Sequence, residues 1–154
     1  MHYLIPAHGP RSSLALLVLR VVVGVAFIFH GNMKLPDPTR WAARSLPGVP
    51  AWLQVIVALV EFGGGFLLIL GFLTPLVAFL IGCDMTVAIF GVHIPKGGHF
   101  VGGPGAFEIP LLYLCLMAAF LLTGPGAYSI DALIAARFAR LPRNGSQPDL
   151  GQVA

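Results

Sequence analysis

Three ionisable residues, Arg20, Glu61 and Asp84, each lie near the middle of a separate apolar run of this sequence. At a rise of 1.5 Å per helical residue, each lies about 12–14 Å from one end of its run. A charge at that depth in a bilayer is costly, so such a side chain usually faces a partner or a polar cavity. We therefore expect these three residues to share a network inside the protein.

The charges of this network do not balance, because two carboxylates face one guanidinium group. Two buried carboxylates cannot both ionise cheaply, so one is expected to hold a proton near neutral pH. A carboxylate that gains and loses a proton suits proton-coupled redox chemistry or transport, which makes Arg20, Glu61 and Asp84 candidate catalytic residues. The alternative is structural, with Arg20 bridging the two carboxylates to fix three helices in register.

A second polar group is expected at one end of the bundle, where it would bind substrate. Its members are His30, Lys34, His93 and Glu108, with Lys96 and His99 just beyond. Imidazole and carboxylate groups can bind transition metals, but the sequence contains no HxxxH or ExxH pair, and no metal site is predicted. The histidines could exchange protons and the lysines could hold an anion. Alternatively, these residues only meet water and head groups, and Glu108 only complements a helix dipole.

The apolar runs that carry these residues are long enough to cross a bilayer. They cover residues 12–31, 52–70, 75–93 and 107–123, and a spanning helix needs about 17–25 residues. Backbone groups must be paired within lipid, and the runs lack the alternating polarity of barrel strands. Of the 154 residues, 57% are hydrophobic and 10% are charged. The sequence predicts an all-α fold, a four-transmembrane-helix bundle over residues 12–128, preceded by an N-terminal arm of residues 1–11.

Four spans would place both termini on one side, side A, and the loops 32–51 and 94–106 on the other, side B. Residues 129–143 are predicted to form a short amphipathic helix on the membrane surface, followed by a disordered tail at 144–154. The basic residues outside the spans divide evenly: Arg11, Arg137, Arg140 and Arg143 on side A, and Lys34, Arg40, Arg44 and Lys96 on side B. A basic amphipathic helix suits an anionic leaflet, so we expect side A to be cytoplasmic.

Several classes of function find no support in the sequence. A net charge of +3, scattered along the chain, does not indicate nucleic-acid binding, although it suits contact with a lipid bilayer. Cys83 and Cys115 form neither a CxxC pair nor a zinc spacing. No haem, flavin or iron–sulfur signature is present, so no cofactor is predicted by motif. The glycine-rich loop 95–105 either supplies turns only or folds as a lid over a pocket.

The apolar runs resemble those of the DoxX family of bacterial and archaeal membrane proteins. The resemblance covers roughly residues 12–135 and is carried by four segments. These are Arg20…Gly24…Phe27-Ile28-Phe29-His30-Gly31…Lys34-Leu35, Glu61-Phe62-Gly63-Gly64-Gly65 through Thr74, Asp84-Met85-Thr86-Val87-Ala88, and Gly124-Pro125-Gly126-Ala127-Tyr128-Ser129-Ile130-Asp131.

The resemblance implies a redox role linked to quinones in the cytoplasmic membrane, and it transfers no catalytic residue. We therefore expect a component of a quinone-linked oxidoreductase in redox or stress metabolism, with quinone as the substrate and a redox enzyme as a partner. Two alternatives remain open: a non-catalytic scaffold subunit for a soluble redox enzyme, and a small carrier of a solute or protons. A carrier of this size could be enlarged by forming a homo-oligomer.

Overall fold

The computed structural model describes residues 8–103 and 105–139, and this part of the chain contains helices and no strand. Five α-helices follow one another along the chain, and α3 continues through a π-helical turn, η1, and a short 3-10 turn, η2. The bounds in chain order are α1 (Pro10–Lys34), α2 (Ala51–Leu70), α3 (Thr74–Val87), η1 (Ala88–His93), η2 (Ile94–Lys96), α4 (Glu108–Thr123) and α5 (Ile130–Ala139).

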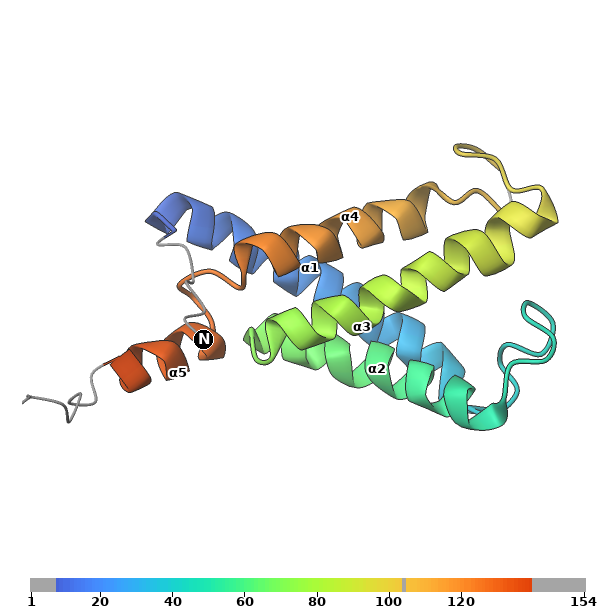
Figure 1. The fold of residues 1–154 in the computed structure, drawn as a ribbon, viewed down its shortest axis with the longest axis horizontal. Coiled ribbons are helices and arrows are strands. Elements are labelled where there is room, and N and C mark those ends of the chain that lie inside the picture. The colour runs from blue at the N-terminus through green and yellow to red at the C-terminus, as the bar shows by residue number, and fades with distance from the viewer. Residues whose placement is uncertain (1–7, 104, 140–154) are drawn as a thin grey trace, which may run out of the picture.

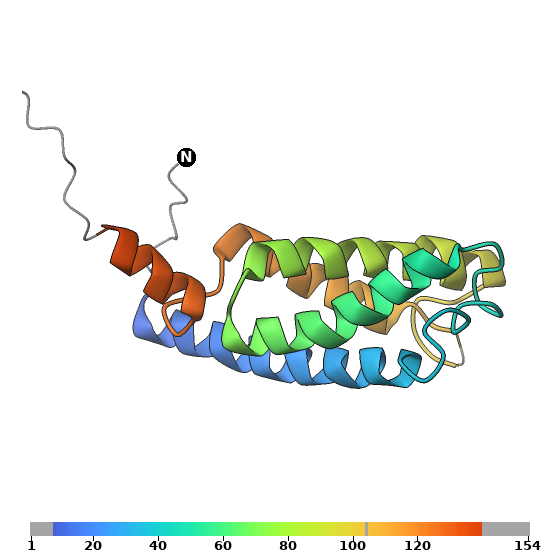
Figure 2. The same ribbon diagram turned by 90° about the horizontal axis from the view of Figure 1, so that it is seen from below.

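Helices α1 to α4 form an elongated bundle with different structures at its two ends (Figures 1 and 2). The tight turn between α2 and α3 and the helix α5 lie at one end, which corresponds to side A. The loop from residue 35 to residue 50 and the loop that follows η2 lie at the other end, side B. Segments distant in sequence therefore meet at side B.

Three helical segments are long and apolar enough to cross a bilayer, namely Pro10–Lys34, Ala51–Leu70 and Thr74–Lys96. Helix α4 is also apolar but shorter, at 16 residues. Large apolar side chains such as Val22, Leu59 and Leu122 are exposed on the outer surface of the helices. Lipid is the solvent that suits such a surface, and the fold is a helical membrane bundle.

The core is built from apolar side chains contributed by all four helices of the bundle. Phe27, Leu68, Ile81, Met117 and Phe120 are completely buried within it. Helix α1 packs mainly on α2, and α3 mainly on α4.

Glycines bring α1 and α2 unusually close together. A Cβ atom added at Gly24 would lie 2.6 Å from the carbonyl oxygen of Gly65. Small residues allow membrane helices to approach in this way.

Asp131, in the first turn of α5, holds the turn between α2 and α3. Its carboxylate accepts hydrogen bonds from the backbone N–H groups of Leu73 and Thr74, both at 2.9 Å, and its own N–H donates to the Gly71 carbonyl. Gly71 and Leu73 have φ values of 64° and 52°, and a leucine rarely adopts this left-handed region. Asp131 thus stabilises a turn that the backbone alone does not favour.

Helix α5 occupies part of the segment predicted to be an amphipathic surface helix. Leu133 and Phe138 on this helix are exposed. Residues 140–143 of that prediction, the predicted tail at 144–154 and residues 1–7 of the predicted arm lie outside the described residues.

Candidate functional site

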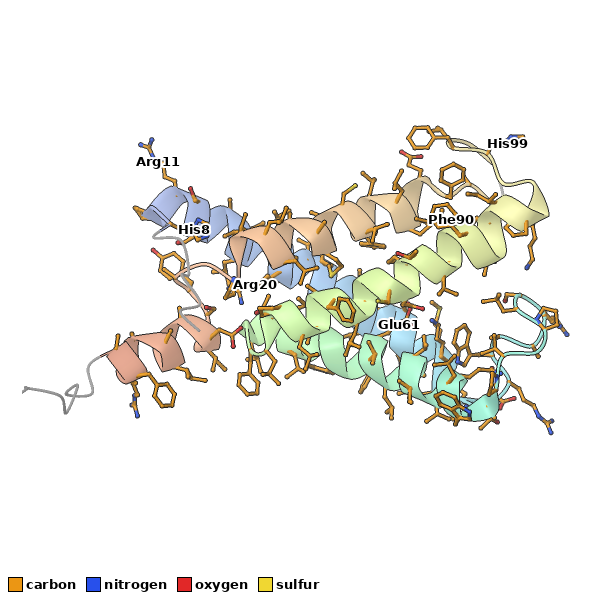
Figure 3. The ribbon with its side chains drawn as sticks, viewed as in Figure 1. His8, Arg11, Arg20, Glu61, Phe90 and His99 are labelled. Atoms are coloured by element: carbon orange, nitrogen blue, oxygen red, sulfur yellow. The ribbon has the colours of Figure 1, made fainter. Side chains whose placement is uncertain are left out.

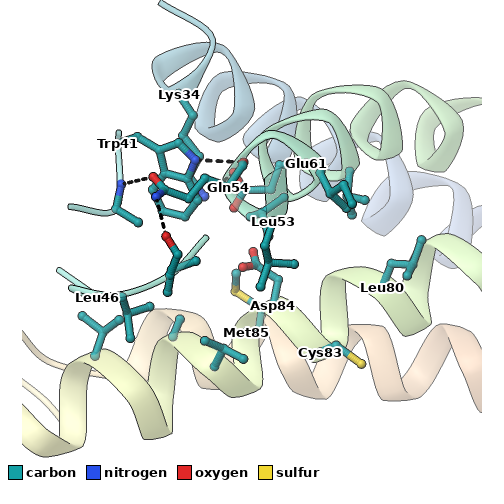
Figure 4. Close-up of a pocket in the computed structure, with 18 residues that line it drawn as sticks. Lys34, Trp41, Leu46, Leu53, Gln54, Glu61, Leu80, Cys83, Asp84 and Met85 are labelled. Atoms are coloured by element: carbon teal, nitrogen blue, oxygen red, sulfur yellow. Dashed lines mark hydrogen bonds and ion pairs between the residues drawn. The ribbon is translucent and has the colours of Figure 1, made fainter. Parts of the chain in front are cut away.

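A buried ion pair joins the side B end of α1 to the middle of α2. The Nζ atom of Lys34 lies 2.6 Å from Oε2 of Glu61, and the two side chains are only 18% and 3% exposed. Side chains on a helix lean toward its N-terminus. Because α1 and α2 are antiparallel, Lys34 leans into the bundle while Glu61 leans toward side B, and the two groups meet (Figure 4).

The loop between α1 and α2 covers this ion pair and holds it in position. The Lys34 ammonium lies 4.0 Å from the centre of the Trp41 ring, which provides a cation–π contact. Trp41 donates through Nε1 to the backbone carbonyl of Gln54. The Gln54 amide accepts from the Ala42 N–H and donates to the Val49 carbonyl, each at 3.0 Å. Gln54, near the start of α2, therefore fixes the loop over the site.

Asp84 faces the same space from α3. It lies within electrostatic range of Glu61, Lys34 and His30, and its Oδ2 atom is buried without a hydrogen-bond partner among the described residues. Lys34, Glu61 and Asp84 sum to one negative charge unless one of the carboxylates carries a proton. Glu61 and Asp84 therefore lie close together inside the bundle, at the wall of one cavity.

The three ionisable groups line a mainly apolar cavity of about 310 Å³ between α2 and α3, to which Gln54 also contributes. Its apolar lining includes Leu53, Ile56, Leu80 and Val87, and all four of these side chains are also exposed on the outer surface of the bundle. Cys83 lines the cavity and is exposed as well. Because these lining side chains are also exposed on the outer surface, the cavity opens sideways, between two helices, toward the space that lipid would fill.

Arg20 does not join this network, and the expectation of a shared site for all three midplane charges is wrong for this residue. Its guanidinium donates to the Leu68 carbonyl at 3.3 Å, to the Ile69 carbonyl at 3.5 Å, and to the Tyr128 carbonyl. Figure 3 shows Arg20 well separated from Glu61 along the bundle.

The physical reason lies in the direction of the side chain. Arg20 leans toward side A with the N-terminal direction of α1, where the last carbonyl groups of α2 lack helical partners. Arg20 donates hydrogen bonds to these carbonyl groups, and Lys34 is instead the cation beside the two carboxylates.

The residues predicted to shape the side B opening are divided among different places. Lys34 faces the α2–α3 cavity, whereas His30 and His93 line a second, smaller cavity. Glu108 begins α4, as the helix-dipole alternative predicts, and it lines neither of these two cavities. Within residues 8–103 and 105–139, no three His, Cys, Asp or Glu side chains are arranged to hold a metal ion.

Trp41, Gln54 and Tyr113 contribute to the two cavities but were not identified from the sequence. The sequence could have identified Gln54, because it is a polar residue inside an apolar run. In the structure it is only 5% exposed. Trp41 and Tyr113 carried none, since an aromatic residue in a loop or an apolar run is unremarkable.

The bundle and its buried ionisable site define a multi-pass helical membrane protein, and the comparisons with known proteins agree. The family model described as DoxX matches residues 15–94, and the chain belongs to the DoxX family. This confirms the resemblance seen in the sequence.

Three relatives illustrate the range of similar proteins. An uncharacterized protein of Haemophilus influenzae is 32% identical over 75% of this chain and 87% of its own length. The "Inner membrane protein YqjF" of Escherichia coli is 33% identical over 80% of this chain and 94% of its own length. The "Putative oxidoreductase CatD" of Bacillus subtilis is 28% identical over 77% and 85%, respectively. No solved structure matches the chain.

Proposed function

We propose that the cavity between α2 and α3 binds the ring of a membrane quinone, and that the chain is the quinone-binding component of a membrane oxidoreductase. The observation that supports this most directly is the combination of an apolar cavity open toward lipid with Lys34, Glu61 and Asp84 in its wall. Small-molecule sites are mostly apolar, with a few polar groups that fix orientation. A volume of about 310 Å³ suits one ring rather than a whole isoprenoid quinone.

The ionisable groups can meet two requirements of quinone reduction, which are to stabilise the negative charge on a carbonyl oxygen and to supply protons. The Lys34 ammonium can donate a hydrogen bond to a quinone carbonyl oxygen, which becomes more negative as the ring is reduced. Glu61 and Asp84, lying side by side with one compensating cation, can hold and release a proton. The isoprenoid tail would leave the cavity past Leu80 and Val87 into the bilayer.

Reduction of a quinone to a quinol requires two electrons and two protons. In this proposal the carboxyl groups deliver the protons to the two quinone oxygens. The electrons come from a partner oxidoreductase that carries a two-electron donor such as a reduced flavin or a dithiol, since the sequence has no cofactor motif of its own. The name of the Bacillus subtilis relative, an oxidoreductase, supports redox chemistry in general and says nothing about the acceptor.

The two native cysteines offer a direct test of quinone binding. Cys83 lines the cavity and Cys115, on α4, does not, while both are exposed. The full chain in lipid nanodiscs would be labelled with an apolar maleimide in the presence of increasing short-chain quinone. We expect quinone to slow labelling of Cys83 at least about tenfold and to leave Cys115 unchanged.

Equal labelling of Cys83 with and without quinone, in protein that is folded by circular dichroism, would overturn the proposal. A Leu80→Trp variant provides a second control, because the indole ring fills the cavity and should abolish quinone protection. If quinone fails to bind but a redox enzyme copurifies with the chain, the scaffold role holds instead. Flux of protons or a solute in proteoliposomes without any redox partner would favour the carrier.

We also propose that α4 is a fourth span and that side A faces the cytoplasm. Helix α4 is about 24 Å long, somewhat less than the hydrocarbon core of about 30 Å, a mismatch that local thinning can absorb. Since Lys34 is turned into the bundle, the basic residues that the sequence places outside the spans divide four to three in favour of side A. Single cysteines at Ala106 and Ala127 should react with an impermeant thiol reagent from opposite sides, Ala127→Cys from the cytoplasm. Reaction of both from one side would exclude this topology.

A further inference from the structure

Glu61 lies in the wall between two cavities rather than at the bottom of one. Besides the α2–α3 cavity, it lines a second cavity of about 180 Å³, whose other walls come from α1, α3, η1 and α4. Met85 and Ala88 of α3 and η1 are shared by both linings as well. A single carboxylate therefore faces two compartments.

The two compartments differ in chemistry. The first is lined mainly by aliphatic side chains, whereas the second carries His30 from α1, His93 from η1 and Tyr113 from α4 in addition to Glu61. Water enters a cavity that is large enough and offers each molecule two to four polar partners. The second cavity meets both conditions and has room for several water molecules.

His93 is placed where such a cavity would meet the side B surface. It is the last residue of η1, and its Nδ1–H donates to the Gly105 carbonyl at 2.8 Å, which ties the glycine-rich loop to the bundle. With Nδ1 as the donor, the neutral ring keeps Nε2 as a proton acceptor. The π-helical turn also matters, because an inserted residue changes which face of a helix the following side chains occupy.

His30 lies deeper, packed among aromatic rings. Its ring centre is 5.9 Å from that of Phe27 and 6.1 Å from that of Tyr113. It lies within electrostatic range of Lys34 and Asp84. The titratable groups around the second cavity and its wall are thus His30 and Lys34 from α1, Glu61 from α2, Asp84 from α3, His93 from η1 and Tyr113 from α4.

We infer that the second cavity is a hydrated proton entrance from side B, in which His93 and His30 pass protons to Glu61 while the ligand of the first cavity enters separately from lipid. The inference rests on the proposed function for the purpose of the protons, but the hydration of the cavity stands on its own lining. Glu61 is the one ionisable residue that lines both cavities. Per turnover, two protons move one after the other from water through the imidazoles to the Glu61 carboxylate, and from there one goes to each oxygen of the reduced quinone.

Cysteine accessibility tests the hydration of the cavity without any knowledge of the reaction. In a Cys83→Ser, Cys115→Ser background, His30→Cys and Tyr113→Cys place a thiol in the second cavity. Phe29→Cys and Leu112→Cys place one at the same depth on the same helices, since both residues are exposed on the outer surface. A charged methanethiosulfonate reagent should modify the two cavity thiols at least about tenfold faster than the two outward thiols.

Equal rates of modification at the cavity and outward positions would overturn the inference. An apolar maleimide, which should reach all four thiols, confirms that each thiol is present and reactive, and circular dichroism confirms that each variant is folded. Reagent added to one face of sealed vesicles should react with the cavity thiols from side B only. Reaction from side A would also overturn the proposed direction of proton entry.

Turnover measurements test the relay itself. With quinone and a redox partner, His93→Ala and His30→Gln should each slow quinone reduction at least about tenfold and increase the solvent isotope effect, and added imidazole should rescue His93→Ala. Quinone protection of Cys83 should persist in both variants. Unchanged rates in both variants would contradict the relay. If quinone never protects Cys83 but the cavity thiols react with the charged reagent, the proposed function fails and the hydrated cavity remains. If quinone protects Cys83 but the cavity thiols react no faster than the outward thiols, only the present inference fails.

Discussion

The ammonium group of Lys34 lies 2.6 Å from Oε2 of Glu61, and it is Lys34 that provides the cation beside the buried carboxylates. The pair joins the end of one helix to the middle of its neighbour and lies under the Trp41 ring. It therefore has two separable roles: it fixes α1 against α2, and it presents one ammonium and one carboxylate to the α2–α3 cavity.

Replacing Lys34 with methionine keeps most of the side-chain volume but leaves the Glu61 carboxylate buried without its cation. An unsatisfied buried polar group costs about 1–3 kcal/mol, so we expect a lower midpoint of thermal unfolding in detergent. The double variant Lys34→Met, Glu61→Gln removes both charges and should be more stable than the sum of the two single effects predicts. Strictly additive losses would show that the two residues do not interact in the folded protein.

The sequence was a good guide to the helices and to the two carboxylates, and a poor guide to their cation. Apolar runs of bilayer length predict helices because the backbone has no alternative in lipid, and the observed helices α1, α2 and α4 begin and end within three residues of the predicted runs. Glu61 and Asp84 meet because similar depth on adjacent helices is enough for them.

The sequence paired the two carboxylates with Arg20 rather than Lys34, because depth along a helix ignores where a long side chain leans. Each of these residues has a long, flexible side chain, so its charge can lie far from its own Cα atom. Arg20 reaches the carbonyl groups at the end of α2, and Lys34 reaches back to Glu61. The sequence places His93 at side B, but nothing in it marks the π-helical turn that ends at this residue.

A Glu61→Gln variant should separate the chemical role of this residue from its structural role. The glutamine amide keeps the shape and still offers an oxygen to Lys34, but it cannot exchange a proton. General acid–base groups typically contribute about 10²–10⁴-fold to rate, so we expect quinone-dependent turnover to fall by at least about 10²-fold. The unfolding midpoint should change by only a few degrees. A loss of stability in proportion to the loss of turnover would identify Glu61 as structural only.

Arg20 is expected to show the opposite behaviour. An Arg20→Lys variant keeps the charge but loses the planar fork that reaches the carbonyls of Leu68 and Tyr128 together. We expect the free energy of unfolding to fall by about 1–3 kcal/mol, while quinone protection of Cys83 in the folded protein stays the same. The exposed Arg11 on the same helix is the matched control, and Arg11→Lys should change neither quantity. If the Arg20→Lys variant kept the parent's stability but lost quinone protection of Cys83, Arg20 would contribute to quinone binding after all.

Asp131→Ala should destabilise the turn between α2 and α3. The substitution removes the acceptor for the N–H groups of Leu73 and Thr74, and loss of such a cap costs about 0.5–2 kcal/mol. Hydrogen exchange should show faster opening of the first turn of α3 and of α5, with little change around Glu61. Asp37 provides the control, because among the described residues its side chain accepts a hydrogen bond only from the exposed Thr39 hydroxyl, and Asp37→Ala should have no measurable effect on exchange in α3.

Gly31 and Gly63 should respond very differently to the same substitution. A Cβ atom at Gly31 would lie 2.6 Å from the Cα atom of Phe62, whereas one at Gly63 would meet no atom within 4 Å. Gly31→Ala must therefore push α1 and α2 apart just where Lys34 reaches Glu61, and overpacking of this kind costs about 1–3 kcal/mol. We expect Gly31→Ala to lower the unfolding midpoint and to weaken quinone protection of Cys83. Gly63→Ala should match the parent or exceed it by up to about 1 kcal/mol, because alanine favours the helix. Similar behaviour of the two variants would mean that the close crossing of α1 and α2 does not hold the ion pair together.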